Sequence, residues 1–187
     1  MNNEIFLNHL IQQTQQGGQF KCLYFWGHTP KQANIVDKSC FSQWFPAQFE
    51  LDGIKYFTAE HYMMAQKAQL FHDDETFDQI LKVKHPNEAK QLGRKVQNYD
   101  EQAWKEKRFN IVLQANLAKF SQHSELRDFL IATHDRILVE ASPVDAIWGV
   151  GMAQDHLDIQ NPEKWKGLNL LGFALMQVRA QLLAQSN

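Results

Sequence analysis

Residues 58–67, which read TAEHYMMAQK, place a carboxylate and an ammonium on one side of a predicted helix. Thr58 is a favourable N-cap residue, so Glu60 falls in the first turn, where the helix dipole and the free amide groups stabilise an anion. Glu60, Met64 and Lys67 share one helix face because they are spaced i, i+4 and i+7. Such a face could form one wall of a catalytic or binding site. The alternative interpretation is an ordinary acidic residue in a first turn.

A second candidate segment, residues 140–151, leads from a buried apolar strand into a loop and reads EASPVDAIWGVG. Trp148 could stack on a base or cover a sugar, and Gly149 would let a ligand approach the backbone closely. The two glycines are not a phosphate-binding fingerprint, because the third glycine and its helix are missing. The alternative is a structural loop in which Asp145 stabilises a turn and Trp148 fills the core.

Basic residues supply a third feature, because Lys90, Arg94 and Lys95 lie together on a predicted helix near Gly93. Arg94 could bind a phosphate through two parallel hydrogen bonds. Solvated surface charge is the simpler interpretation of the same cluster.

Aromatic residues form a fourth feature. Ser42 and Gln43 stand among three aromatic residues in the segment FSQWF, residues 41–45, and Trp104 follows on a later predicted helix. A ring such as Trp44 beside a hydroxyl and an amide suits a pocket for a nucleobase. Packing of these rings into the core is the alternative.

Glu60 and Asp145 come from distant segments, and a pair of carboxylates is suited to cleaving a glycosidic bond. One acid protonates or orients the leaving group, and the other activates water or supports the oxocarbenium charge. Carboxylates fit this task because the transition state is cationic at the sugar carbon. The hypothesis requires the fold to place both acids on one cavity, whereas acids on opposite faces would favour a helical scaffold without catalytic function.

The composition narrows the class of protein. The chain has 187 residues, 19 basic and 21 acidic, for a net charge of −2, which argues against binding nucleic acid through bulk charge. The length predicts one domain with a real hydrophobic core. No apolar run is long enough to span a membrane, and the first residues do not follow the pattern of a signal peptide. Cys22 and Cys40 are too few for a disulfide framework, so we expect free thiols and a cytoplasmic location.

The elements that must position these residues are mostly helical. Apolar periodicity predicts a mainly α, multihelical domain with a few short β-strands. Asp52-Gly53 between two alternating runs predicts a hairpin, Ser124 is expected to cap a short helix, and Asn169 is expected to cap the last one. Helices are predicted over 3–16, 58–70, 73–83, 86–96, 100–120, 124–132 and 169–183, and strands over 20–26, 47–57 (the hairpin) and 136–141.

Six motifs stand out in combination: Phe41–Trp44, Thr58–Lys67, Leu92–Arg94, Leu117–Phe120, Asp145–Gly149 and Asn169–Met176. Through these motifs, in family order, the chain resembles the YbiA-like family, also called NADAR, over residues 20–183. Many relatives carry Ser-Asn-Phe where this chain has Ser42-Gln43-Trp44, so the amide and the ring are kept. We therefore divide the chain into an N-terminal helical extension, 1–19, and a YbiA-like domain, 20–187.

The resemblance implies a mainly α fold and N-glycosidase activity on ribosylated compounds. The implied substrates are phosphoribosylamino-pyrimidine intermediates of riboflavin synthesis, or ADP-ribose attached to guanine, free or within nucleic acid. It implies no redox cofactor and no metal. A non-catalytic module that binds ADP-ribose or a nucleotide is the alternative. By motif, Glu60 and Asp145 would be catalytic, and the substrate would contact Ser42, Trp44, Lys67, Arg94, Trp104, Trp148 and Gly149.

Overall fold

The computed structural model describes residues 4–33 and 35–185. The first three residues of the predicted extension and the last two of the predicted domain lie outside the described residues. The elements are α1 (Ile5–Gln15), β1 (Cys22–Phe25), the 3-10 turn η1 (Lys38–Phe41), β2 (Phe49–Leu51), β3 (Ile54–Tyr56), α2 (Ala59–Leu70), α3 (Asp74–Lys82), α4 (Pro86–Gly93), α5 (Glu101–Gln122), α6 (Ser124–Ile131), β4 (Ile137–Glu140), the 3-10 turn η2 (Pro162–Lys164) and α7 (Leu170–Gln185). The predicted fold class, mainly α with a few short strands, is confirmed.

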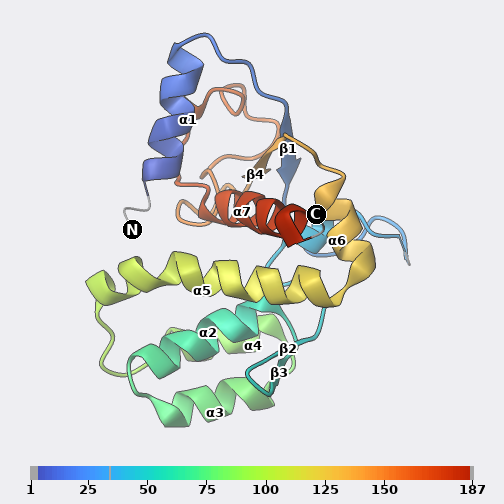
Figure 1. Ribbon diagram of the computed structural model, residues 1–187. Coiled ribbons are helices and arrows are strands. Elements are labelled where there is room, and N and C mark those ends of the chain that lie inside the picture. The colour runs from blue at the N-terminus through green and yellow to red at the C-terminus, as the bar shows by residue number, and fades with distance from the viewer. Residues whose placement is uncertain (1–3, 34, 186–187) are drawn as a thin grey trace.

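The helices are stacked in layers around α5 (Figure 1). Helix α5 lies between α7 on one side and α2 on the other, and α3 and α4 pack against α2. Helix α7 is largely apolar and almost entirely buried along its first three turns, as expected for a helix surrounded by protein. This arrangement places the start of α2 close to the centre of the molecule.

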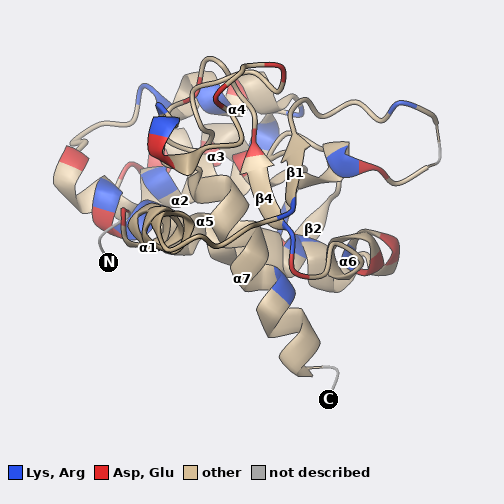
Figure 2. Cartoon of the chain, turned by 90° about the horizontal axis from the view of Figure 1, so that it is seen from above, with Lys and Arg blue, Asp and Glu red and all other residues tan. Residues whose placement is uncertain are grey.

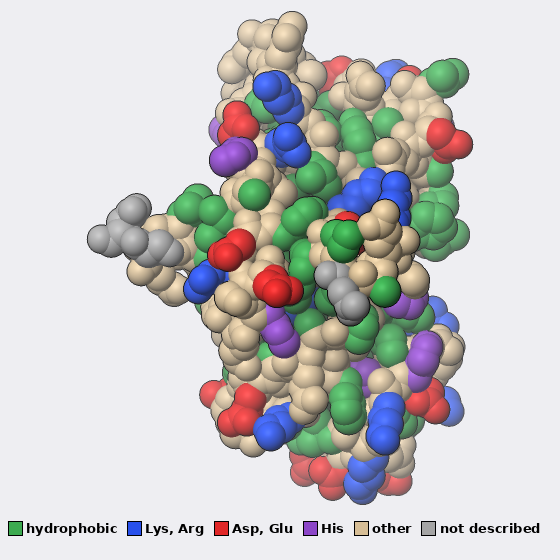
Figure 3. All heavy atoms as spheres, turned by 90° about the vertical axis from the view of Figure 1, so that its right-hand side faces the viewer, with side chains coloured by type: hydrophobic (Ala, Val, Ile, Leu, Met, Phe, Trp, Pro, Cys, Tyr) green, Lys and Arg blue, Asp and Glu red, His purple; other side chains and the backbone are tan. Residues whose placement is uncertain are grey.

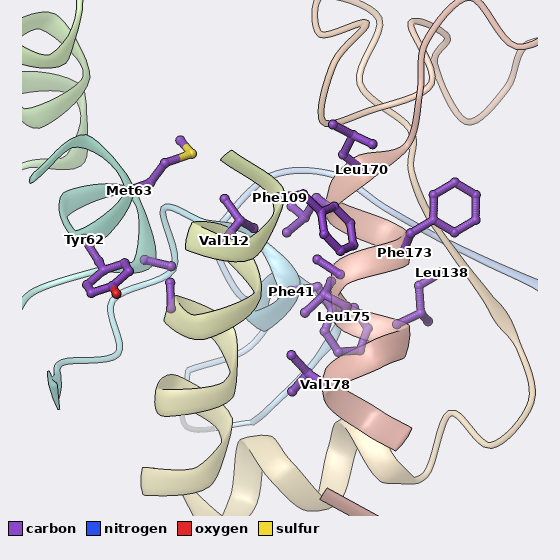
Figure 4. Packing of buried hydrophobic residues seen from close by; sticks show 14 of the residues in the cluster. Phe41, Tyr62, Met63, Phe109, Val112, Leu138, Leu170, Phe173, Leu175 and Val178 are labelled. Carbon is purple, nitrogen blue, oxygen red and sulfur yellow. The ribbon is translucent and has the colours of Figure 1, made fainter. Parts of the chain in front are cut away.

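Apolar side chains of α2, α5 and α7 contribute much of the core, together with residues such as Phe41 and Leu138 (Figure 4). Phe109 and Val112 of α5 lie between Leu175 of α7 on one side and Tyr62 and Met63 of α2 on the other. All five side chains are at most 3% exposed. Burial of this kind contributes about 1.5–3 kcal/mol per large side chain, so the core fixes α2 relative to α5 and α7.

Helix α1 packs on the same core. The ring of Phe6 stacks on Phe109 at 5.1 Å and on Phe173 at 5.5 Å between centroids, and Leu10 is buried. Phe6 of the predicted helical stripe therefore packs against the two central helices, whereas Ile5 is exposed.

Two pairs of strands complete the fold. Strands β1 and β4 are parallel, with Phe25 opposite Glu140 at their carboxyl ends. Parallel strands end at the same edge of a sheet, so the loops that follow them, residues 26–37 and 141–161, leave from the same edge. Strands β2 and β3 form the predicted hairpin, and Asp52 (φ 54°) and Gly53 (φ 77°) adopt the left-handed backbone that a tight two-residue turn requires.

Two predicted helix caps are wrong. Ser124 is the first residue of α6, and His123 occupies the N-cap without a side-chain hydrogen bond. Asn169 precedes α7, but its side chain bonds strand β4: its Oδ1 accepts from the Glu140 N–H and its Nδ2 donates to the Leu138 carbonyl, both at 2.9 Å. Contacts between distant elements, which local propensity does not include, decide the role of Asn169.

Candidate active site

One large cavity, of about 870 Å³, lies between α2, α4, the segments 26–28 and 42–44, and the start of the 141–161 loop. A smaller hollow of about 330 Å³ beside α1 has no carboxylate or basic side chain among its lining residues. Ligand sites are concave, with a few convergent polar groups, which favours the larger cavity. It is lined by every predicted site residue except Gly149: Ser42, Trp44, Glu60, Lys67, Arg94, Trp104, Asp145 and Trp148.

Glu60 reaches the cavity from the first turn of α2. Thr58 caps this helix, since its hydroxyl oxygen accepts from the His61 N–H at 3.4 Å, and the Glu60 N–H donates to the Gln43 carbonyl at 3.0 Å. Glu60 is only 3% exposed. Burial raises the pKa of its carboxyl to about 7, while Lys90 and a hydrogen bond from the Trp44 side chain oppose the shift. Its Oε1 is buried and has no hydrogen-bond partner among the described residues.

Asp145 reaches the same cavity from the loop after β4. Its Oδ1 accepts hydrogen bonds from the backbone N–H groups of Ile147 and Trp148, each at 2.8 Å, and its carbonyl accepts from Gly151 at 3.2 Å. These bonds fix the loop that carries the Trp148 ring. The charge of Asp145 also raises the pKa of Glu60, so the two acids predicted from distant segments interact across one cavity.

Gly149 lies behind the cavity wall rather than on it. A Cβ atom at this position would come within 2.8 Å of the Glu140 carbonyl oxygen and within 3.0 Å of the Asp145 carbonyl oxygen. The next residue, Val150, donates its N–H to the same Glu140 carbonyl at 2.9 Å. Close approach at Gly149 is therefore between two parts of the chain, and it folds the loop back onto the end of β4.

The basic residues of the cavity come from α2 and α4. Lys67 donates from Nζ to the Gly93 carbonyl at 2.8 Å and lies 4.2 Å from the centroid of the Tyr99 ring. Arg94, at the C-cap of α4, is exposed. Lys90, which belongs to the predicted basic cluster but was not among the predicted site residues, also lines the cavity, and its Nζ lies 5.7 Å from the centroid of the Trp44 ring. Its neighbour Lys95 is not among the lining residues.

Indole rings line much of the cavity. Trp104 is 8% exposed, whereas Trp44 is half-buried and lies beside the His28 ring at 5.6 Å between centroids. Trp26 and Val144, which are 59% and 86% exposed, are at the mouth. Flat apolar surfaces of this kind bind planar bases by stacking.

Buried polar groups of α5 hold the segment with Ser42 and Trp44. Lys119 donates from Nζ to the carbonyl oxygens of Cys40 (2.6 Å) and Ser42 (3.0 Å). Asn116 donates to Oε1 of Gln43 at 2.8 Å, and the Ser42 hydroxyl accepts from the Trp44 N–H at 3.2 Å. One cavity wall is thereby attached to the centre of the molecule.

Sequence reasoning named Gln43 only as a neighbour of the aromatic residues and missed Glu140 as a candidate, although both line the cavity. The side-chain nitrogen of Gln43 and Oε2 of Glu140 are buried and have no hydrogen-bond partner within the described ranges. Burial and the charges of Asp145 and Glu60 raise the pKa of Glu140 to about 8. The available signal was a single acid at the end of the otherwise apolar strand ILVE, residues 137–140. In Figure 2 this acidic strand end, in red, points toward the side of the molecule that α4 occupies.

Neither a metal cluster nor a membrane helix is found in the part of the chain that the structure describes. No group of three or more His, Cys, Asp or Glu side chains there could hold a metal ion. No helix of the described residues is long and apolar enough to cross a membrane. Both cysteines are free thiols.

Similarity to known proteins agrees with the fold and the cavity. The chain is 42% identical over 168 residues to N-glycosidase R617 of Acanthamoeba polyphaga mimivirus, covering 86% of this chain and 96% of the relative. It is 36% identical over 146 residues to N-glycosidase YbiA of Escherichia coli K12, covering 78% and 81%. The NMR structure of E. coli YbiA superimposes with a TM-score of 0.72 at 31% identity, covering 90% of this chain and 89% of that one.

The fold and these relatives define a class of hydrolases, the N-glycosidases, which cleave N-glycosyl bonds. The NADAR domain model matches residues 24–183. The chain belongs to the NADAR domain family, which confirms the resemblance inferred from the six motifs.

Proposed function

We propose that this protein hydrolyses the N-glycosidic bond of a ribosylated base or amine, either a phosphoribosylamino-pyrimidine intermediate of riboflavin synthesis or ADP-ribosylated guanine. The observation that carries the proposal is the meeting of Glu60 and Asp145 on one cavity together with the Trp148 ring. Two interacting carboxylates beside an aromatic surface fit a reaction with a cationic sugar carbon and a planar leaving group.

In the proposed reaction, one acid acts on the leaving nitrogen or on water and the other supports the ribosyl cation. The bond between the sugar C1′ and nitrogen breaks, and its electron pair stays on nitrogen, which takes a proton. The oxygen of water bonds to C1′ and gives up a proton, so the sum is the addition of one water. Asp145, with one oxygen held by the loop, is suited to supporting the cation, because that task needs a fixed negative charge.

Binding would divide between rings and basic side chains. Trp44, Trp104 and Trp148 supply apolar faces for the base, and Arg94 and Lys67 supply the positive charge for a phosphate. Arg94 is the stronger candidate for phosphate contact, since the Nζ of Lys67 already donates to the Gly93 carbonyl.

The small-molecule form of the substrate is favoured over a nucleic acid. The net charge is −2, and Figure 3 shows basic and acidic side chains interspersed over one face of the molecule. Counterion release from a duplex needs a contiguous set of basic residues. We propose that the protein acts on metabolites in the cytoplasm.

A substrate panel with product identification tests this function. The protein would be incubated with a phosphoribosylamino-pyrimidine, with ADP-ribosylated guanosine, and with the same modified guanine in an oligonucleotide, and mass spectrometry would detect released base or amine. Release of base or amine by the wild type but not by Glu60→Gln supports the proposal. Binding of ADP-ribose without release from any substrate would refute it and favour a binding module.

A further inference from the structure

Glu140 is held rigidly at the edge of the cavity. Its N–H donates to Oδ1 of Asn169 at 2.9 Å and its carbonyl accepts from Val150 at 2.9 Å. Its side chain lines the same cavity as Glu60 and Asp145, and its Oε2 is buried without a partner among the residues described. A third acid, fixed through its backbone on two sides, therefore belongs to the wall of the candidate site.

Glu60 and Glu140 both interact with Asp145 and Lys90, but the rest of their electrostatic surroundings differ. Glu60 lies in the first turn of α2, where the helix dipole favours the anion, and it also has Arg94 and the Trp44 hydrogen bond near it. The charged groups that face Glu140 are Glu60 from α2, Asp145 from the loop and Lys90 from α4, so two of the three are acidic. Neighbouring carboxylates do not readily ionise together, so the proton goes to the one with the poorer surroundings for an anion.

We propose that Glu140 is a catalytic acid, which carries the proton delivered to the leaving nitrogen, while Glu60 stays ionised and acts as the base for water. This assignment rests on the proposed N-glycosidase function and decides which acid performs which task. Asp145 then keeps the role of supporting the cation.

Protons are conserved over one reaction cycle in this assignment. The Glu140 carboxyl gives its proton to the nitrogen as the C1′–N bond breaks, and Glu60 takes a proton from the water whose oxygen bonds to C1′. Afterwards Glu140 is ionised and Glu60 is protonated. Return of that proton from Glu60 to Glu140, directly or through solvent in the cavity, restores the enzyme.

The pKa values of the two acids agree with this order. Burial raises both, and with the different charges around each the pKa of Glu60 is about 7 and that of Glu140 about 8. A base must be ionised, so activity falls as pH drops through the lower value, and an acid must be protonated, so activity falls as pH rises through the upper value. The two groups titrate as a coupled pair, and the expected profile of kcat/KM is a bell with its maximum near pH 7–8.

Glu140→Gln tests the assignment, since it keeps the size of the side chain and removes the proton donor. We expect kcat/KM to fall on the order of 10²–10⁴-fold, with loss of the alkaline limb of the profile. Among amines that the wild type accepts, the defect should shrink as the leaving group becomes more acidic. Glu125→Gln, an exposed carboxyl on α6, is the matched control and should leave the rate and the profile unchanged.

A second measurement does not depend on turnover. The carboxyl signals of ¹³C-labelled glutamate, followed by NMR against pH, should show Glu140 still protonated at pH 7, and the signal should be absent in Glu140→Gln. Wild-type rate and an intact alkaline limb in Glu140→Gln, or an ionised Glu140 at pH 7, would overturn the assignment while leaving the proposed function in place. A protonated Glu140 in a protein that releases no base would instead refute the proposed function.

Discussion

The Nζ atom of Lys119 lies 3.0 Å from the carbonyl oxygen of Ser42, so a fully buried lysine of α5 holds the segment that forms one cavity wall. Burial lowers the pKa of this lysine to about 8. The same Nζ also donates to the Cys40 carbonyl, so two hydrogen bonds attach this segment to α5.

Lys119→Met is therefore expected to loosen that wall. The carbonyls of Cys40 and Ser42 lose their donor, which costs roughly 1–3 kcal/mol in the free energy of unfolding. Substrate binding should weaken, so that KM rises more than kcat falls. Denaturant unfolding and steady-state kinetics measure both effects. Lys107→Met, at an exposed position of the same helix, is the control, and equal behaviour of the two variants would contradict the positioning role.

Glu60→Gln should abolish most of the activity without unfolding the protein. The amide fills the same volume in the buried site but neither ionises nor takes a proton from water. We expect turnover to fall on the order of 10²–10⁴-fold, with a circular dichroism spectrum like that of the wild type. Near-normal turnover would remove Glu60 from the mechanism.

The stability of the protein should fall as pH rises through the neutral range. Burial raises the pKa of Glu60 from 4.5 to about 7 and that of Glu140 from 4.5 to about 8. Between pH 4.5 and 8 the folded state thus holds more protons than the unfolded state, and linkage requires the free energy of unfolding to decrease with pH there.

The double variant Glu60→Gln/Glu140→Gln isolates this effect. His61, whose pKa burial lowers to about 4, acts in the opposite direction below pH 6.5, but it is common to both proteins and cancels in their difference. We expect the variant to be more stable than the wild type by several kcal/mol at pH 8 and by less than about 1 kcal/mol at pH 4.5. A pH-independent difference in urea unfolding would contradict the raised pKa values.

Trp44→Phe should shift the pH dependence of the reaction while keeping a ring in the cavity wall. The variant loses the hydrogen bond that lowers the pKa of Glu60, so that pKa rises and the acidic limb of the kcat/KM profile moves to higher pH. Trp104→Phe is the comparison, because Trp104 lines the cavity but does not affect the pKa of Glu60. Trp104→Phe should change KM but leave the acidic limb of the kcat/KM profile at the same pH. The same shift in both variants would exclude this specific role for Trp44.

Gly149→Ala should displace the loop that carries Asp145. The added methyl group would lie 2.8 Å from the Glu140 carbonyl oxygen and 3.0 Å from that of Asp145, and backbone cannot yield as a flexible side chain can. We expect lower stability, by roughly 1–3 kcal/mol, together with lower activity. Thermal unfolding measures the first effect, and wild-type stability would show that the loop has room to adjust.

Much of the local structure follows from the sequence because its causes are local. Asp52-Gly53 adopts the turn that its left-handed preference favours, and Thr58 caps α2 through a hydroxyl three residues before its donor. Glu60 is placed in a first turn by the same reasoning. Glu60 and Asp145 could also be named in advance, because acids of this kind in recognisable motifs predict glycosidase chemistry.

Other features exist only in the folded chain. Asn169 bonds β4 instead of capping α7, and Glu140 meets Glu60 only because the end of β4 and the first turn of α2 line one cavity. The pKa of an acid depends on how much water surrounds it and on charges from other elements, none of which is encoded by its neighbours in the sequence. The sequence by itself therefore determined the elements and the candidate acids, whereas tertiary packing decided which carboxyls share a cavity and which of them holds a proton.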